Sequence, residues 1–245
     1  MKLFELLEYT AKEFLDDRTE LVEGDPDELW SDKTLIRYFN EAERRLCRRA
    51  WVLIDIGNPT AGVVTLATGK PVYALHPSIL RVISATPEGA AIPLPRSTDD
   101  RVHAYQAPGA DEPFDVNTVH AITPGAPRTY TTDAGMRLLR VVPTPAAEQS
   151  GLKLILKVAR MPICSLSEDK PDASPEVPDE WHLDVLCKYA AGMCLTHPNA
   201  DASAKTEGRR LLSEVEASIK EARQERQRAE AAESKFLYAS TTACL

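Results

Sequence analysis

The chain has 245 residues and a formal net charge of −8. A chain with this acidic balance lacks the broad basic surface on which general binding to a phosphate backbone depends. No apolar run approaches the roughly 18 residues of a membrane-spanning helix, and the acidic N-terminal segment does not have the pattern of a signal peptide. We therefore expect a protein that folds in the reducing cytosol and has no membrane span.

The prolines divide the chain into three parts. Sixteen of the 18 prolines lie between Pro59 and Pro178, whereas the sequence on either side favours helix. Turns this dense in proline and glycine are typical of an antiparallel sheet or sandwich rather than of a βαβ array. We predict an α+β fold with four parts: a helix bundle of residues 1–54 and 178–222, an inserted antiparallel β-rich domain of residues 55–165, a linker of residues 166–177, and a long C-terminal helical arm of residues 223–245.

The N-terminal part predicts two main helices. The first spans residues 2–16 and carries its leucines on one face. A strongly acidic stretch follows, in which Asp25-Pro26 is typical of the start of a short helical turn. The second helix, residues 32–51, is capped by Ser31 and has the clearest amphipathic pattern in the chain.

The polar face of this second helix carries a compact cationic patch, because residues i and i+4 lie above one another on a helix. Its members are Arg44, Arg45, Arg48 and Arg49. One interpretation is a solvated face whose charge is tempered by Glu41 and Glu43. The other is a contact with nucleic acid or with an acidic partner surface. The acidic stretch 13–32, in this chain or in a neighbouring one, offers such a surface.

The middle part predicts an antiparallel sheet or sandwich. Short apolar or alternating segments indicate strands at residues 63–67, 80–85, 128–132, 136–142 and 152–159. The sequence Asp133-Ala134-Gly135 predicts a hairpin turn between two of these strands. Residues 98–106 favour a short helix.

The C-terminal part begins with an acidic, proline-rich segment, residues 165–180, that is typical of a surface linker. A helix of residues 179–195 follows, and Asn199 or Asp201 can cap a last helix. The apolar stripe of this last helix ends at Ala222. Beyond that point opposite charges recur at helical spacing, so solvent could support the helix.

The end of the chain is apolar again, with Phe236, Leu237, Tyr238 and Leu245. One interpretation is a frayed terminus. The other is docking into a partner, because apolar side chains displayed past a charged helix favour burial against another protein. The arm would then become ordered on assembly.

Motifs for chemistry are missing from the sequence. It contains no Walker A loop, GxGxxG, GxSxG or HExxH, and its five cysteines match no zinc or redox spacing. We expect reduced thiols, no metal, no cofactor and no enzyme activity. We also expect His182 to pack against its neighbours or to pair with Asp179 or Glu180.

Two alternatives from other functional classes stay open. The first is a binding module, in which the β-rich domain recognises a receptor or a glycan through Tyr105, Phe114 or Tyr130. The second is an enzyme with a site formed between separate elements that uses His76, His103 or His120.

Five segments in succession carry a family resemblance. They are SDKTLIRYFNEAERRLCRRA at 31–50, LHPSILRVISA at 75–85, IPLPRSTDDRV at 92–102, GAPRTYTTDAGMRLLRVVPTP at 125–145, and the stretch 152–211, which contains PEVPDEWHLDVLCKYAAGMCL. In this order they resemble the tailed-bacteriophage head-to-tail adaptor proteins, or portal-tail connectors. The resemblance covers roughly residues 31–222, and the arm 223–245 is less typical of the family.

The resemblance implies a structural virion protein, synthesised in the bacterial host cytoplasm and located at the portal-tail junction. It implies a homo-oligomeric ring, commonly a twelvefold dodecamer, whose partners are the portal protein, tail or nozzle proteins and other copies of itself. Genomic DNA would pass through the channel without sequence-specific binding, for which an acidic or neutral lumen is suited.

Within such a ring we expect residues 200–245 to contact the portal. We expect the β-rich region, residues 55–165, to face neighbouring subunits or tail proteins. The arginine patch would contact the portal or a neighbouring subunit, or would border the path of the DNA.

Overall fold

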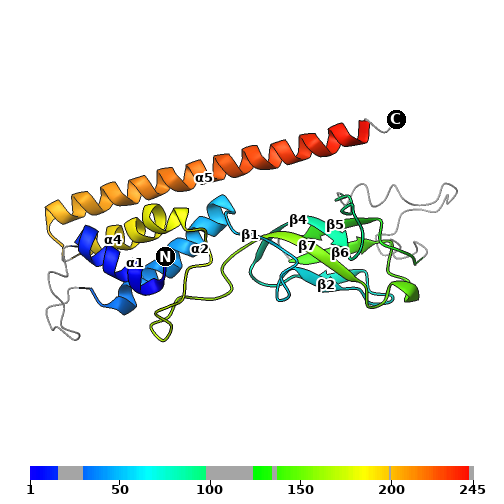
Figure 1. Ribbon diagram of the computed structural model, residues 1–245, viewed down its shortest axis with the longest axis horizontal. Helices are drawn as coiled ribbons and strands as arrows, with labels where there is room; N and C mark the ends of the chain where they lie inside the picture. The colour runs from blue at the N-terminus through cyan, green and yellow to red at the C-terminus, as the bar shows by residue number, and fades with distance from the viewer. Residues whose placement is uncertain (16–29, 98–123, 134–136, 199, 243–245) are drawn as a thin grey trace, which may run out of the picture. The chain divides into compact units, whose positions relative to one another are not determined.

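The protein is an α+β protein that divides into two compact units. The computed structural model describes residues 1–15, 30–97, 124–133, 137–198 and 200–242, with side chains as far as residue 231 (Figure 1). One unit combines Met1–Leu53 with Met161–Leu245 and is helical. The other, Ile54–Arg160, is a continuous stretch of chain that contains all the described strands.

The helical unit begins with α1 (Leu3–Thr10), which continues into a π-helical turn, η1 (Ala11–Leu15). The next helix, α2 (Asp32–Ala50), begins after Ser31 and ends at Trp51, whose backbone is left-handed with a φ of 55°. Both helices lie close to the positions that the sequence predicts. The short turn predicted at residues 25–28 lies outside the described residues.

After the β unit, the chain returns to the helical unit. There η5 (His182–Cys187), a π-helical segment, leads directly into α4 (Lys188–Leu195). The last helix, α5 (Ala202–Thr242), is 41 residues long. Because α5 contacts α2, η5 and α4, the two ends of the chain form one core.

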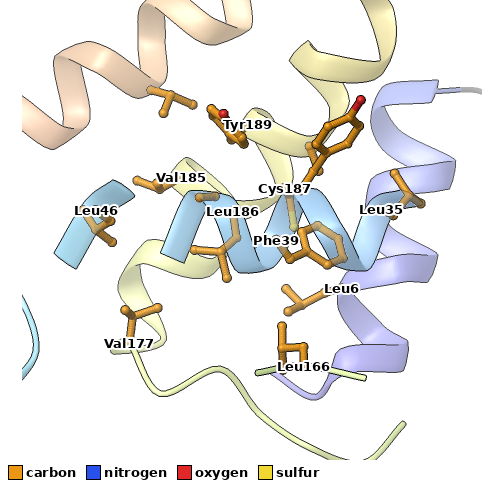
Figure 2. Packing of buried hydrophobic residues seen from close by; sticks show 14 of the residues in the cluster. Leu6, Leu35, Phe39, Leu46, Leu166, Val177, Val185, Leu186, Cys187 and Tyr189 are labelled. Carbon is orange, nitrogen blue, oxygen red and sulfur yellow. The ribbon is translucent and has the colours of Figure 1, made fainter. Parts of the chain in front are cut away.

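The core of the helical unit is built on the apolar face of α2. Leu35, Phe39 and Leu46 are fully buried there, and Figure 2 shows them among Leu6 of α1 and Leu186 of η5. Burying a side chain of this size stabilises the fold by roughly 1.5–3 kcal/mol. The helices therefore depend on mutual packing more than on their own propensity.

Helices α4 and α5 approach each other closely where both carry glycine. A Cβ added at Gly192 would lie 2.8 Å from Leu212 Cγ, and one added at Gly208 would lie 3.0 Å from the carbonyl oxygen of Gly192. These distances are shorter than ordinary van der Waals contact, so this crossing requires residues without a Cβ.

The segment 166–177, which the sequence predicts to be a surface linker, contributes to the helical core at both of its ends. Leu166 and Val177 belong to the buried cluster (Figure 2). Most of the residues between them are exposed, which accounts for the acidic, proline-rich composition. The segment has no helix or strand, but its ends are packed against the bundle.

The β unit contains two antiparallel sheets. In the first, β7 (Lys153–Arg160) is the central strand. It pairs along one edge with β4 (Ile79–Pro87), and along the other with β1 (Ile54–Ile56) and then β2 (Val63–Thr65). The register places Val82 opposite Val158 and Val63 opposite Ile155.

The second sheet has three strands in the order β3-β6-β5. They are β3 (Val72–Ala74), β6 (Leu138–Val142) and β5 (Thr129–Asp133). Tyr130 of β5 is buried, and its hydroxyl donates a hydrogen bond to the carbonyl oxygen of Ile83 in β4 at 3.3 Å, which links the two sheets.

Alternation along the strands fills the core of the β unit. Leu154, Leu156 and Val158 of β7 are buried, as the period of two predicts. The five predicted strands correspond to β2, β4, β5, β6 and β7 within a few residues. Strands β1 and β3, each of three residues, were not predicted. The helix predicted at residues 98–106 lies outside the described residues.

Candidate functional site

Helix α2 presents a polar outer face opposite its apolar core face, because its apolar residues recur at helical spacing. A groove of about 770 Å³ lies between this outer face and the segment Ser165–Glu168. Six cationic side chains line it: Lys33, Arg37, Arg44, Arg45, Arg48 and Arg49. Two carboxylates, Glu41 and Glu168, line it as well.

Two of the four arginines of the predicted patch join α2 to α5. Arg45 donates a hydrogen bond to Glu216 Oε1 at 2.5 Å, and Arg49 donates to Glu216 Oε2. Partial burial opposes ionisation of Glu216, but the hydrogen bonds from Arg49 and Arg45 outweigh it and lower the pKa of this carboxyl. Arg45 and Arg49 therefore serve the packing of the bundle.

The other two arginines of the patch are available to a partner. Arg44 donates to the neutral Ser165 Oγ at 3.0 Å, so its charge is not compensated there. Arg48 is exposed and forms no ion pair with any residue that the structure describes. The structure thus divides the predicted patch into a structural pair, Arg45 and Arg49, and an open pair, Arg44 and Arg48.

Lys33 and Arg37 extend the open pair toward the start of α2. Both are exposed, and Arg37 lies over the ring of Tyr38 at 4.9 Å from its centroid. We call Lys33, Arg37, Arg44 and Arg48 the basic stripe. Lys33 and Arg37 were not among the predicted site residues, although they are four residues apart, as Arg44 and Arg48 are.

Glu41 interrupts the basic stripe and is held by a tyrosine. The Tyr189 hydroxyl of α4 donates a hydrogen bond to Glu41 Oε1 at 2.7 Å, and the Arg45 guanidinium lies 5.6 Å from the centroid of the Tyr189 ring. Burial and the neighbouring Glu41 carboxylate raise the pKa of Tyr189 to about 12. The tyrosine therefore stays protonated and keeps donating at physiological pH.

The second wall of the groove is fixed to α2 by Asn40. Its Oδ1 accepts the backbone N–H of Leu166 at 2.8 Å, and its Nδ2 donates to the carbonyl oxygen of Leu166 at 3.0 Å. Both backbone groups of one residue are satisfied by one side chain. The wall is therefore held in place despite lacking secondary structure.

Glu43 fixes the far end of the same segment. Its Oε1 accepts the backbone N–H groups of Glu176 at 2.7 Å and of Val177 at 3.1 Å. Glu176 in turn accepts the N–H groups of Ile163 and Cys164 at 2.7 and 2.6 Å. Glu43 does not lie on the solvated arginine face, because it is 1% exposed and faces inward, although its carboxyl still interacts electrostatically with Arg44.

Burial raises the pKa of Glu43, and the two backbone hydrogen bonds offset part of this effect. The buried Glu43 carboxyl accepts hydrogen bonds from backbone N–H groups that lie in no helix or strand and would otherwise be unsatisfied. The groove therefore has one helical wall and one wall held by side chains of that helix.

Helix α5 continues past the other helices of its unit (Figure 1). Its buried positions, Leu211, Val215, Ile219 and Ala222, end where the sequence predicts, and no side chain from residue 223 to 231 is buried. The backbone stays helical to Thr242, so Phe236, Leu237 and Tyr238 are on the helix. The side chains of these three residues, and Leu245, lie outside the described part.

Of the residues on which the two alternative functions rest, only His76 and Tyr130 lie in the described part of the chain. His76 Nδ1 lies 2.8 Å from Ser78 Oγ within its own turn, and His103 and His120 are outside the described residues. Tyr130 belongs to the core and presents no surface for a glycan, whereas Tyr105 and Phe114 lie outside the described residues.

His182 is buried, with Nε2 3.0 Å from the carbonyl oxygen of Val177 and Nδ1 3.2 Å from Asp179, its predicted neighbour.

The described residues contain neither a metal site nor a membrane-spanning helix. No group of three or more His, Cys, Asp or Glu side chains there could hold a metal ion. In the same part of the chain, no helix combines the length and apolar character needed to cross a membrane.

Comparison with protein families gives a match over nearly the whole chain. Residues 1–235 match the profile of a family described as SU10 adaptor protein. A comparison with curated proteins finds no match. The family match includes both the helical unit and the β unit.

Proposed function

The chain belongs to the SU10 adaptor protein family, and from this membership we propose that it forms a homo-oligomeric ring between the portal and the tail of a phage particle. Proteins of this family are structural phage adaptors and virion components. In the proposed ring, commonly of twelve copies, each subunit binds its neighbours and the ring joins portal to tail. DNA passes through its centre.

The length of α5 is the observation that supports the proposed contact with the portal. The helix runs from Ala202 to Thr242, yet among its side chains described as far as residue 231 the last buried one is Ala222. An isolated helical stretch beyond a core is marginal in water, and packing against another surface is the usual source of its stability. An arm that extends from a folded bundle supports docking to a second protein.

Charge supports passage of DNA through the ring without tight binding. The chain is net acidic, and a lumen formed by an acidic protein repels the phosphate backbone. The β unit, with its own core, supplies a second body that faces neighbouring subunits or tail proteins in this proposal.

The test of the proposal is a variant that lacks residues 223–245. The core of the helical unit should stay folded because the deleted residues include none of its buried members. We expect the variant, supplied to a phage that lacks its own adaptor gene, to leave filled heads that are not joined to tails. Infectious titre and electron microscopy of the particles measure this.

A length-matched control shows whether the side chains of the arm or only its length matter for joining heads to tails. In it, residues 223–242 are replaced by a helix-forming sequence of glutamate, alanine and lysine, so that the arm keeps its length and loses its own side chains. We expect this control to fail like the deletion. If the deletion variant gives infectious particles at the wild-type titre, the arm has no role in joining heads to tails.

A further inference from the structure

We propose that the groove on α2 binds a carboxylate-rich segment of another polypeptide. The inference goes beyond the ring proposed above and stands on the groove alone. It concerns the basic stripe, Lys33, Arg37, Arg44 and Arg48, and the wall formed by Ser165–Glu168. Four features of the groove support it: the unpaired charge of the basic stripe, the spacing of its members, the mixed charge of the lining residues and the fixed walls.

The free charge of the stripe results from the way the arginines are divided. Glu216 compensates Arg45 and Arg49, whereas Arg44 and Arg48 form no ion pair with a described residue. Arg44 donates a hydrogen bond to the neutral Ser165 hydroxyl and interacts with the buried Glu43 carboxyl through its charge alone. The stripe therefore presents positive charge that is not paired with a carboxylate among the described residues of the helical unit. A guanidinium binds a carboxylate well because its planar N–H groups match the two oxygens.

The spacing of the stripe suits a peptide. With a rise of 1.5 Å per residue, Lys33 and Arg48 lie roughly 22 Å apart along the helix axis, and members four residues apart lie roughly 6 Å apart. Alternate side chains of an extended peptide are spaced by roughly 6.6 Å, so carboxylates two residues apart can meet both cations of the pair Lys33 and Arg37 or of the pair Arg44 and Arg48. Arg37 and Arg44 lie roughly 10 Å apart along the axis, which corresponds to about three residues of the extended peptide.

The mixed lining favours a polypeptide over nucleic acid. Glu168 is exposed on the wall opposite the stripe and forms no ion pair with a described residue, and Glu41 interrupts the stripe itself. A phosphodiester chain is negative at every unit and meets both carboxylates with repulsion. A polypeptide can place a cationic or neutral residue at those two points. The net charge of −8 also disfavours nucleic acid.

Because the walls of the groove are already fixed, binding a partner costs less conformational entropy. Asn40 holds Leu166, and Glu43 holds Glu176 and Val177, so the non-helical wall does not have to become ordered when a partner arrives. A preorganised site binds more tightly than a site of the same charges on a flexible loop.

The experiment measures binding of a fluorescein-labelled oligoglutamate peptide to the full chain by fluorescence anisotropy at low salt. The test variant is R44Q/R48Q, which removes two charges of the open pair and leaves Arg45 and Arg49 in place. Because each exposed ion pair contributes modestly, we expect binding roughly three- to thirtyfold weaker than for the wild type. Added sodium chloride should weaken wild-type binding more than that of the variant.

The matched control is R209Q/R228Q, which removes two exposed arginines of α5 outside the groove. It has the same net charge as the test variant, so binding to charge in general would be weakened equally in both. We expect the control to bind the peptide as the wild type does. Melting curves show whether each variant is folded, and the exposed positions of Arg44 and Arg48 predict that it is.

Two further measurements locate the site. E168Q removes a repelling carboxylate from the wall and should tighten peptide binding. A short DNA duplex should compete poorly with the peptide. The proposal is overturned if R44Q/R48Q and R209Q/R228Q bind alike, if E168Q binds more weakly than the wild type, or if the duplex displaces the peptide and binds more tightly.

Discussion

The two units of this protein are stabilised by different kinds of contact. In the helical unit, polar contacts join residues 126 and 134 positions apart, from Asn40 to Leu166 and from Glu43 to Val177. The β unit is one continuous stretch, Ile54–Arg160, with its own buried strands. The interrupted unit thus relies on specific polar contacts to hold its returning segment, whereas the continuous unit relies on strand pairing and apolar burial.

This difference explains where side chains serve as acceptors for backbone N–H groups. The segment 161–181 crosses the surface of the bundle without helix or strand for most of its length, so its buried backbone N–H groups need side-chain acceptors. Glu43 and Glu176 supply them. In the β unit the ladders of β7 satisfy the same requirement by backbone alone.

The largest effect is expected from one core leucine in each unit. Leu46 of α2 and Leu156 of β7 are both fully buried, so either change to alanine should lower the free energy of unfolding by about 3 kcal/mol. Denaturant unfolding measures the loss. Hydrogen exchange should show lost protection in the helical unit for L46A and in the β unit for L156A. Equal loss in both units for either variant would contradict the division.

The next effect concerns the clamp between α2 and the returning segment. Glu43→Ala leaves the N–H groups of Glu176 and Val177 without their acceptor, and should lower the free energy of unfolding by roughly 2 kcal/mol. Glu43→Gln keeps a carbonyl acceptor and should lose clearly less. If both variants unfold at the same denaturant concentration as the wild type, the clamp does not stabilise the unit.

A smaller effect is expected at the crossing of α4 and α5. Gly208→Ala places a methyl group 2.9 Å from Leu195 Cβ, which costs roughly 1–3 kcal/mol of overpacking. Alanine also recovers about 1 kcal/mol of helix propensity. We therefore expect a net loss of about 1 kcal/mol, measured by thermal unfolding, whereas a gain in stability would show that the helices can separate without cost.

The smallest predicted effect is a difference between the two units in how their stability depends on pH. The folded state holds the proton of Glu43 more tightly than the unfolded state does, because burial raises its pKa above 4.5. Stability of the helical unit should therefore fall as pH rises from about 4.5 through this raised pKa, and Glu43→Gln should remove that dependence.

In the β unit, stability should change with pH in the opposite direction, and at lower pH. Burial opposes ionisation of Asp55, but hydrogen bonds from Arg160 and Asn58 lower its pKa below 3.8. Its contribution to stability is present above pH 3.8 and is lost as pH falls through the lowered pKa. Unfolding curves at several pH values, read separately for each unit by hydrogen exchange, check both signs. A Glu43→Gln profile identical to the wild type would contradict the first.

Much of the fold follows from local pattern. Helix α2 was predicted at 32–51 and β7 at 152–159, because amphipathic spacing and alternation depend only on which face is buried. Strands β1 and β3 were not predicted because three residues carry no period, and their pairing depends on β7 and β6. The ends of the 166–177 segment were predicted to be solvated because composition does not reveal that Asn40 and Glu43 hold them.

The candidate site was predicted in part. The sequence indicates an arginine patch on α2, since i and i+4 positions coincide on a helix. It does not reveal that Arg45 and Arg49 pair with Glu216 of α5, more than 160 residues away, or that Ser165–Glu168 forms a second wall. Tertiary pairing decides which charges stay free, so the open pair could be identified only from the structure.

The most direct test of the proposed role is a cryo-electron microscopy map of the portal-tail junction in an intact virion. We predict a ring of copies of this chain below the portal, with residues 223–242 packed as a helix against portal subunits. A map in which the chain lies elsewhere in the particle, or in which this helix contacts no other protein, would contradict the account.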